Sequence, residues 1–403
     1  MPIRQFHLLR AYAEWGRVKL VVFYRNQDQL EATRALAEYC ESVHPVSVAQ
    51  TYGQTVLGLL PRWHRRLRLT CARRPSAMTR GYSPEMARII EELATSADLV
   101  HVARLHMVPQ VERLLAHRSD RPRFVLDLAD IETSWFARRL RFTSLVQWPS
   151  LVLGLYELVR LWRYQAAAAR WFDRVLVCSD RERDRLRSGN VIVVPHGTKV
   201  PSELPRSETD GRTLLFCGWL SYPPNADALE FFVARVLPLI RKEVPDVRLL
   251  IVGHAPTPRI RALPDGEGIQ VAADVPSVAE YYRKATVAVV PLRFGSGTRM
   301  KILEAWALGV PVVSTSLGCE GLDVSDGEQL ALADTPGQFA RACVALLRAP
   351  ALRRRLVQRG RELVWRKHRW EVIGAEVVGM AREVLVTEPE EALDRLWRMV
   401  VGA

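Results

Sequence analysis

Short runs of apolar and β-branched residues alternate with helix-like stretches along nearly the whole chain. In its first half these runs lie at residues 18–24, 43–48, 99–102, 124–128, 174–178 and 191–194. In its second half they lie at 213–217, 248–252, 268–271, 286–290, 311–314 and 329–332. Strands that alternate with helices are typical of parallel sheets, and runs that are apolar on both faces indicate helices on each side. We therefore predict an α/β chain with doubly wound parallel sheets.

A break separates the two sets of predicted strands. Residues 195–197 (PHG) lead into the polar, proline-containing stretch 201–212 (PSELPRSETDGR), a composition typical of a linker. A chain of 403 residues is long enough for two or three domains. We predict two Rossmann-like domains, at residues 1–197 and 198–370.

Both ends of the chain depart from a simple pair of such domains. Residues 4–15 show helical spacing that ends at Gly16, whereas a Rossmann-type half begins with a strand and a Gly-rich turn. We therefore expect the first strand of the N-terminal domain to be missing. Either the sequence begins downstream of the natural start, or the domain is assembled without its usual central strand. At the other end, helical segments are predicted at about 371–385 and 390–401, and we expect this tail (371–403) to cross back onto the first domain.

The chain carries a marked excess of positive charge. It has 57 Lys and Arg against 44 Asp and Glu, a formal net charge of +13, while 48% hydrophobic residues exclude a mainly disordered chain. Such charge suggests nucleic acid, a membrane surface or a phosphorylated substrate as a partner. No helix-turn-helix, RNP or zinc pattern accompanies it, so nucleic acid is not expected.

The sequence gives no sign of a disulfide framework or a metal site. The six cysteines are scattered without a C-x-x-C pair, and no Asp-x-Asp occurs. The N-terminus lacks the apolar core of a signal peptide, and the uncharged run 143–156 is too short to span a bilayer. We expect a soluble cytoplasmic protein, either free or bound peripherally to a membrane.

The most informative stretch is residues 286–322, TVAVVPLRFGSGTRMKILEAWALGVPVVSTSLGCEGL. A predicted strand is followed by Gly295 and Gly297, and then by a helix predicted from about residue 298 to residue 308. A strand, a Gly-rich turn and a helix in this order point free backbone N–H groups at an anion. The pattern therefore favours a phosphate ligand.

Two cations and a carboxylate lie in this predicted helix. Arg299 and Lys301 fall in its first turn, where positive charge is unfavourable against the helix dipole unless an anion is bound. Glu304 falls one turn deeper on the same face, placed to accept hydrogen bonds from a ribose diol. The alternative is a tight βα turn with Glu304 as a surface residue, because glycine motifs alone have false positives.

Three groups of sequence segments resemble one enzyme family. GSGTRMKILEAWALGVPVVST, followed by GCEGL, closely resembles the donor-binding segment of group 1 (family 4) retaining glycosyltransferases with the GT-B fold. FCGWLSYPPNADALEFF resembles the start of the C-terminal domain in a subset involved in exopolysaccharide assembly. IRQFHLLRAYA, YSPEMARII, DLVHV, DRVLVCS and VIVVPHGT resemble successive landmarks of the N-terminal domain in that subset.

This resemblance implies a fold and an activity. The fold is two Rossmann-like domains facing a cleft. The activity is transfer of a hexose, with retention, from a nucleotide-diphosphate sugar to a glycan or lipid-linked acceptor. The absence of an Asp-x-Asp sequence fits a transferase that needs no metal, and no cofactor is expected. The donor-binding residues that we predict are Gly218, Gly295, Ser296, Gly297, Thr298, Arg299, Lys301 and Glu304.

The sequence departs from the family in two places at this site. The family has a Glu-x7-Glu pair, whose second carboxylate matches Glu304 and whose first falls at Ser296. The hexose contact would then rest on Ser296, on backbone amides of residues 294–297 or on another group. The Arg and Lys that usually follow the first strand of the second domain are absent from residues 218–226 (GWLSYPPNA). We expect the two cations of the predicted helix to neutralise the diphosphate instead.

Weaker candidates lie at other strand ends of the second domain. Gly218 permits close approach to phosphates, whereas Asn225 is expected to cap the next helix. His254 and Asp274 lie where the family usually seats the base, although a lone His at a strand end is more often packed or solvated.

The catalytic candidates of the first domain are Asp130 and His101. Asp130 lies in residues 126–135 (LDLADIETSW), which begin within a predicted strand whose C-terminal end should face the cleft. Asp127 and Glu132 are the other carboxylates there. Core packing is an equal alternative for His101, and capping is an equal alternative for Asp127.

An arginine-rich segment lies between residues 42 and 84, where no acidic residue occurs. Its arginines include Arg62, Arg65, Arg66, Arg68, Arg73 and Arg74. Leu60, Trp63 and Leu69 are interleaved with them, and each basic residue near an anionic leaflet contributes about 1 kcal/mol. We predict contact with an anionic membrane surface, the alternative being a solvated helix face.

Two other functions remain open beside glycosyl transfer. One is a sugar-nucleotide epimerase of the GT-B fold. The other is a catalytically weak scaffold subunit, which the missing strand and Ser296 suggest.

Overall fold

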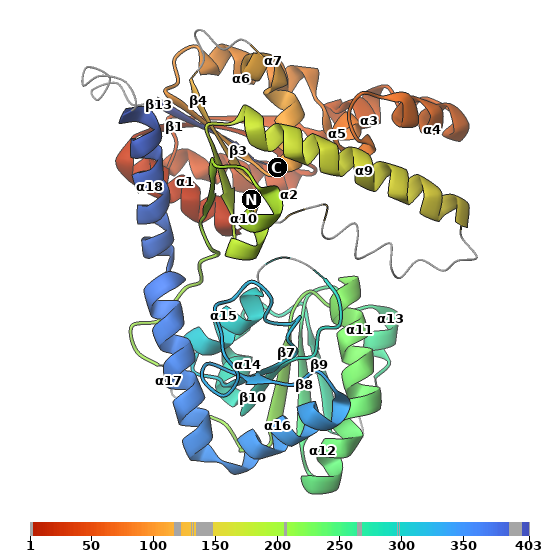
Figure 1. Cartoon of the computed structure of the whole chain (residues 1–403), viewed down its shortest axis with the longest axis vertical. Helices are drawn as coiled ribbons and strands as arrows, with labels where there is room; N and C mark the ends of the chain where they lie inside the picture. Colours follow the sequence, from red (N-terminus) through yellow and green to blue (C-terminus); the bar gives the residue numbers. More distant parts are fainter. Residues whose placement is uncertain are drawn as a thin grey trace. The chain divides into compact units, whose positions relative to one another are not determined.

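A computed structural model of the chain describes residues 3–116, 122–129, 131, 133, 148–204, 208–263, 268–295, 297, 299–386 and 397–402. The chain forms two compact units (Figure 1). Unit 1 contains Met1–Pro195 and Ile373–Ala403, and unit 2 contains His196–Val372. Each unit has one parallel sheet with helices packed on it, as the alternation of strands and helices predicts.

The described sheet of unit 1 has seven strands in the order β2-β1-β13-β3-β4-β5-β6, and every neighbouring pair is parallel. Their bounds are β1 Arg17–Tyr24, β2 Ser42–Ser47, β3 Leu99–Ala103, β4 Arg123–Asp127, β5 Arg174–Val177, β6 Val191–Val193 and β13 Trp397–Gly402. The six strands predicted in the first half of the chain are confirmed. β13 was not predicted.

β13 fills the middle of this sheet from the far end of the chain. It pairs with β1 from Arg17↔Trp397 to Val22↔Gly402, and with β3 from Arg398↔Leu99 to Val401↔Val102. The prediction of a helix over residues 390–401 is therefore wrong where it overlaps this strand. The prediction of a missing central strand also needs correction, because β13 occupies that position. A strand is needed at this position because, without β13, the facing edges of β1 and β3 would have unsatisfied backbone N–H and C=O groups.

The helices of unit 1 bury one face each against this sheet or its loops. In α6 the side chain of Ser83 accepts a hydrogen bond from the Met86 N–H, Pro84 begins the helix, and Met86, Ile90 and Ala94 are buried along one side. The described helices of the unit are α1 Ile3–Trp15, α2 Gln27–Arg34, α3 Tyr52–Thr55, α4 Arg62–Cys71, α5 Ser76–Gly81, α6 Pro84–Ala94, α7 Glu112–Ala116, α9 Trp148–Trp171, α10 Asp180–Leu186 and most of α18 Trp370–Val386. The helix predicted before the first strand is confirmed as α1.

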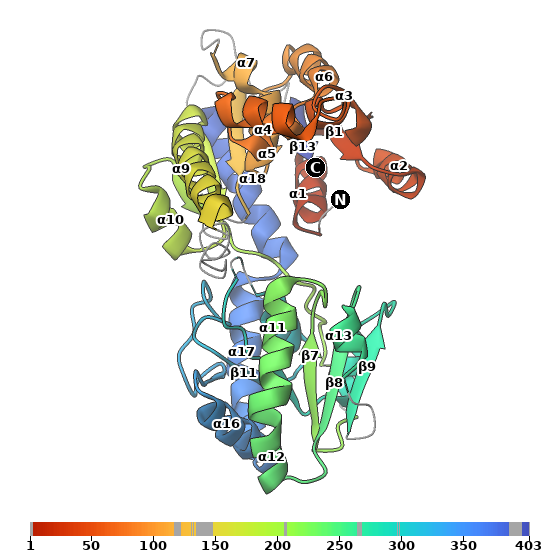
Figure 2. The same cartoon turned by 90° about the vertical axis from the view of Figure 1, so that its right-hand side faces the viewer.

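The described sheet of unit 2 has six strands in the order β12-β11-β10-β7-β8-β9, all parallel. Their bounds are β7 Thr213–Cys217, β8 Arg248–Gly253, β9 Ile269–Ala273, β10 Val287–Val290, β11 Val312–Ser314 and β12 Ala331–Leu332, and all six were predicted. The helices are α11 Pro223–Phe231, α12 Leu237–Glu243, α13 Pro258–Arg261, α14 Ala279–Lys284, α15 Met300–Ala307, α16 Pro336–Arg348 and α17 Pro350–Lys367. Figure 2 shows α11 and α12 running end to end beside β7 and β8.

The core of unit 2 lies between this sheet and its helices. Phe216, Phe232, Trp306 and Phe339 are almost completely buried there. Because the strands are parallel, their C-terminal ends meet at one edge, where loops gather after β7, β8, β9 and β10. No helix in the described part of the chain combines the length and apolar character needed to cross a bilayer.

Candidate donor site

The C-terminal edge of the sheet in unit 2 has unusual backbone geometry. Gly295 and Gly297 have φ angles of 121° and 85°, in a region that residues with side chains rarely adopt. Ala255 and Asp274, after β8 and β9, also have positive φ angles of 50° and 53°. A Cβ on Gly253 would lie 1.7 Å from the Gly218 carbonyl oxygen, so glycine lets these loops touch. Such conformations concentrate at functional sites.

Lys301 lies in the first turn of α15 and reaches the end of β7. Its Nζ donates a hydrogen bond of 2.8 Å to Asn225 Oδ1 and lies 4.2 Å from the centre of the Phe216 ring. A Cβ on Gly218 would come within 3.0 Å of this Nζ, so the glycine makes room for the ammonium group. Burial lowers the pKa of Lys301 to about 7. The structure thus brings predicted residues Gly218 and Lys301 together.

Asn225 has a different role from the predicted one. The residue at the N-cap position of α11 is Tyr222, and the Asn225 side chain makes no capping bond, so that prediction is wrong. Its Nδ2 instead donates to the Trp219 carbonyl at 2.8 Å while its Oδ1 accepts from Lys301. A single sequence carries no signal for this link, because the two partners are 76 positions apart.

Arg299 and Glu304 complete the predicted cluster on α15. Arg299 is 6% exposed, and its Nη2 donates a hydrogen bond of 3.5 Å to the Leu317 carbonyl. The first turn of the helix contains no acidic residue. The Tyr282 hydroxyl donates to a Glu304 carboxylate oxygen at 3.5 Å, and burial raises the pKa of this carboxyl. The helix itself begins at Met300, close to the predicted start.

Four candidate residues fall outside the described part of the chain. They are Ser296 and Thr298 of the donor turn and Asp130 and Glu132 of the first domain. The hexose contact and the catalytic carboxylate therefore remain predictions.

His101 is buried within β3 of unit 1. It is 2% exposed, the Tyr12 hydroxyl lies 3.0 Å from its Nδ1, and the two rings meet edge to face. Burial lowers its pKa to about 4. This placement favours the packing alternative over a catalytic role.

Asp127 is completely buried at the end of β4. It accepts a 2.8 Å hydrogen bond from Arg4 Nε, and its other oxygen accepts from the Ala129 N–H at 3.2 Å. Arg4 also donates to the Pro195 carbonyl at 2.8 Å. The second contact agrees with the capping alternative. Sequence reasoning missed the ion pair because its partners are 123 positions apart.

An exposed aromatic residue, Trp219, follows Gly218 in the turn after β7. His254 Nδ1 is 2.5 Å from Asp274 Oδ1, and the Trp219 ring meets the His254 ring edge to face. Trp219 is 61% exposed, which is unusual for its size. The Ala255 N–H bond to Asp274 is the main factor that lowers the pKa of that carboxyl. Sequence reasoning passed over Trp219, although a large aromatic residue directly after a strand-end glycine was a usable signal.

The six arginines named in the arginine-rich segment lie in α4 and in the turn that follows it. Arg74 donates to Glu112 through two nitrogens, at 2.9 and 2.6 Å, and stacks on Tyr82. Arg68 and Arg73 are exposed. The side chains of Arg62 and Arg66 lie outside the described part of the chain. Membrane contact through these arginines remains a prediction.

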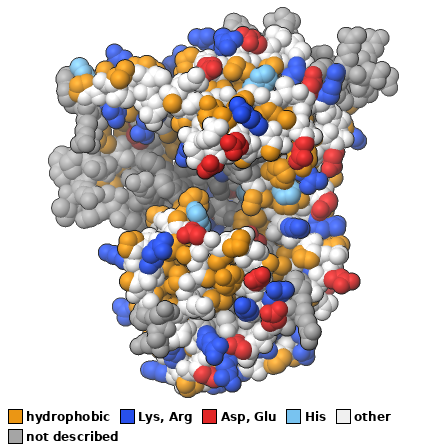
Figure 3. All heavy atoms as spheres, turned by 180° about the vertical axis from the view of Figure 1, so that it is seen from behind, with side chains coloured by type: hydrophobic (Ala, Val, Ile, Leu, Met, Phe, Trp, Pro, Cys, Tyr) orange, Lys and Arg blue, Asp and Glu red, His pale blue; other side chains and the backbone are white. Residues whose placement is uncertain are grey.

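Two properties of the described surface concern charge and metals. Basic and acidic side chains are interspersed on the face shown in Figure 3. The described residues contain no group of three or more His, Cys, Asp or Glu side chains arranged to hold a metal ion.

Residues 211–349 match the family model of "Glycosyl transferases group 1". The chain is 31% identical over 181 residues to an "Uncharacterized 44.6 kDa protein in cps region" of Klebsiella pneumoniae, covering 42% of this chain and 46% of that protein. It is 28% identical over 232 residues to a phosphatidyl-myo-inositol mannosyltransferase of Mycobacterium leprae, covering 53% of this chain and 61% of the relative. The chain thus spans about half of the length of the curated relatives that it matches.

Two solved structures share the fold. The sucrose-phosphate synthase of Thermosynechococcus elongatus has a TM-score of 0.63 and 17% identity over 92% of this chain and all of that one. The Anabaena protein Alr3699/HepE, crystallised with UDP and glucose, has a TM-score of 0.62 and 12% identity over 94% and 96% of the two chains. The parallel α/β units with glycine turns and cations at a strand edge agree with these matches. The chain therefore has the GT-B fold and carries a group 1 glycosyltransferase domain in its second unit.

Proposed function

We propose that the chain transfers a hexose from a nucleotide-diphosphate sugar to a glycan or lipid-linked acceptor. The reaction proceeds with retention and without a bound metal or cofactor, in the synthesis of exopolysaccharide or another cell-surface glycan. The protein acts in the cytoplasm, at the inner face of an anionic membrane. The matches to a cps-region protein and to mannosyltransferases support the proposal of a sugar transferase.

One observation carries the proposal. Arg299 and Lys301 lie at the N-terminal end of α15, whose first turn has no acidic residue to offset them. In the transfer step, negative charge develops on the departing diphosphate. Fixed cations and backbone N–H groups aimed at that charge stabilise it most in the transition state. Glu304, one turn deeper, accepts hydrogen bonds from the ribose.

Titration with nucleoside diphosphates tests the donor site directly. We expect Lys301→Gln and Arg299→Gln each to weaken binding of UDP or GDP by roughly tenfold or more, since each removes a charge-assisted contact. Lys242→Gln is the matched control, because Lys242 is an exposed lysine of the same unit. Equal affinity of the Lys301 variant and the Lys242 variant would exclude the assignment.

Turnover assays separate the proposed reaction from its alternatives. Release of nucleoside diphosphate that depends on an acceptor extract supports transfer. Interconversion of nucleotide sugars without release would instead identify an epimerase. Donor binding without either reaction would identify a scaffold subunit.

A further inference from the structure

The outer face of α9 is an apolar stripe. Val152, Leu155, Tyr156, Val159 and Trp162 follow one another at spacings that place them on one side of the helix, and each is 44–59% exposed. Figure 1 shows the first half of α9 extending beyond the sheet of unit 1. Contiguous exposed apolar surface of this kind marks an interaction site.

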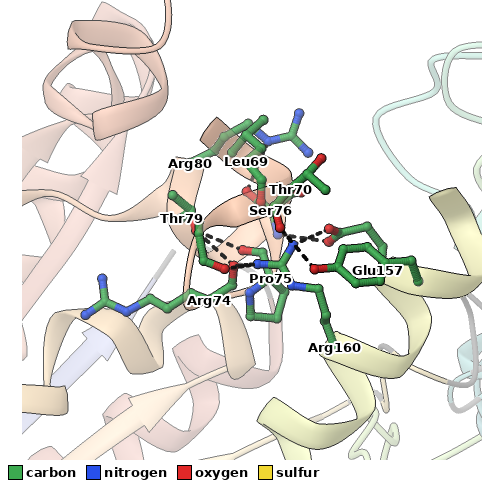
Figure 4. Close-up of polar contacts among 11 residues, drawn as sticks. Leu69, Thr70, Arg74, Pro75, Ser76, Thr79, Arg80, Glu157 and Arg160 are labelled. Atoms are coloured by element: carbon green, nitrogen blue, oxygen red, sulfur yellow. Dashed lines mark hydrogen bonds and ion pairs between the residues drawn. The ribbon is translucent and has the colours of Figure 1, made fainter. Parts of the chain in front are cut away.

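Side chains of α9 form hydrogen bonds with α4 and hold it beside this stripe. The Tyr156 hydroxyl donates to the Thr70 carbonyl at 3.1 Å. The guanidinium group of Arg160 donates to three carbonyls at the end of α4 and in the turn after it (Figure 4), those of Leu69, Ala72 and Arg74. A guanidinium is the right group for this position, because the carbonyls at a helix C-terminus carry partial negative charge. The basic helix and the apolar stripe therefore form one surface, which we call the α4–α9 face.

The described acidic groups nearest this junction are already neutralised. Glu157 pairs with Arg160 and also accepts from the Ser76 N–H, and Glu112 pairs with Arg74. Three exposed arginines remain for which the described residues provide no hydrogen-bond or ion-pair partner: Arg68, Arg73 and Arg163. The α4–α9 face thus has a net positive charge beside apolar surface.

A cavity of about 890 Å³ adjoins the same face. Its lining includes Arg73 and Arg163 together with the apolar side chains of Leu115, Ala167 and Trp171. Cationic and apolar walls in one cavity suit a molecule with a phosphate at one end and hydrocarbon at the other.

We propose that the α4–α9 face docks on an anionic lipid bilayer. The stripe of α9 lies at the boundary between head groups and acyl chains, where Tyr and Trp are favoured, and Arg68, Arg73 and Arg163 contact lipid phosphates. A second copy of the chain fits less well, since it would bring a second set of unneutralised arginines to the first. The inference deepens the membrane part of the proposed function, because it names the surface and adds α9 to the arginines of α4.

Sedimentation with lipid vesicles tests this surface without any donor or acceptor. Vesicles of phosphatidylcholine alone are compared with vesicles that also contain phosphatidylglycerol. We expect the full chain to bind the anionic vesicles, and the triple variant Arg68→Gln, Arg73→Gln, Arg163→Gln to bind them on the order of a hundredfold more weakly, about fivefold per arginine. The control triple Arg235→Gln, Arg341→Gln, Arg354→Gln removes the same charge from exposed positions of unit 2 and should bind like the parent.

The apolar contribution is tested by a matched pair of tryptophan variants. Trp162→Ser should weaken vesicle binding several-fold, including at high salt, whereas Trp365→Ser on unit 2 should not. Equal binding by the two arginine triples, or by the two tryptophan variants, would overturn the inference. So would a chain that ignores vesicles and forms dimers that Trp162→Ser dissociates. Because nucleotide binding is measured separately, failure here leaves the transferase proposal intact, and failure of that proposal leaves this test valid.

Discussion

The two units share one strand order but fill its first position from different parts of the chain. In unit 2, β7 is the first strand of the unit and lies between β8 and β10. In unit 1 the same position, between β1 and β3, is taken by β13. With β13 counted as strand one, both sheets follow the Rossmann order, in which the first strand neighbours the second and the fourth.

This difference bears on where each unit can carry chemistry. In unit 2, β7 runs directly through Gly218 and Trp219 into α11, and this turn meets Lys301 through Asn225. In unit 1, β13 and α1 are at opposite ends of the chain, so no turn of this kind joins them. The contacts of Asn225 with Lys301 and Trp219 lie in the unit whose first strand runs directly into a turn and a helix.

The largest expected effect comes from removing β13. Deletion of residues 387–403 leaves β1 and β3 without their shared neighbour, and we expect unit 1 to lose cooperative unfolding while unit 2 keeps it. Hydrogen exchange measures this by peptide, through the protection of β1 and β3 against that of β7 and β8. A chain shortened only by Ala403 is the control. If β1 and β3 stay equally protected in both chains, the sheet of unit 1 does not depend on β13 for its stability.

The second effect concerns buried charge in unit 1. Arg4→Met removes the guanidinium group that pairs with the fully buried Asp127 carboxylate, which should cost about 3–5 kcal/mol in the free energy of unfolding. The double variant Arg4→Met, Asp127→Leu should cost clearly less, because no uncompensated charge remains. Urea unfolding of the two variants and the parent measures the difference. Equal losses in the single and the double variant would show that packing, not charge, holds this corner together.

Local pattern predicted the strands of both units but not their long-range partners. The strands from β1 to β12, and α15 with its two cations, follow from short runs of sequence. β13 does not, because a short apolar run such as WRMVVG can be read as helix or strand until its neighbours are known. Those neighbours lie in residues 17–22 and 99–102. Asn225 and Lys301, and likewise Arg4 and Asp127, meet only once the fold is formed.

The smallest effect concerns the response to pH of the buried lysine in unit 2. Burial lowers the pKa of Lys301 to about 7, whereas an arginine at this position would stay protonated. A diphosphate binds the protonated lysine better, so affinity for UDP should fall as pH rises above about 7, by at most about tenfold per pH unit. Titration calorimetry across this range measures the fall. Lys301→Arg should bind with a nearly flat profile, because its guanidinium stays protonated. A flat profile in the parent, or a fall of the same size in Lys301→Arg, would mean that Lys301 does not supply the charge that holds the diphosphate.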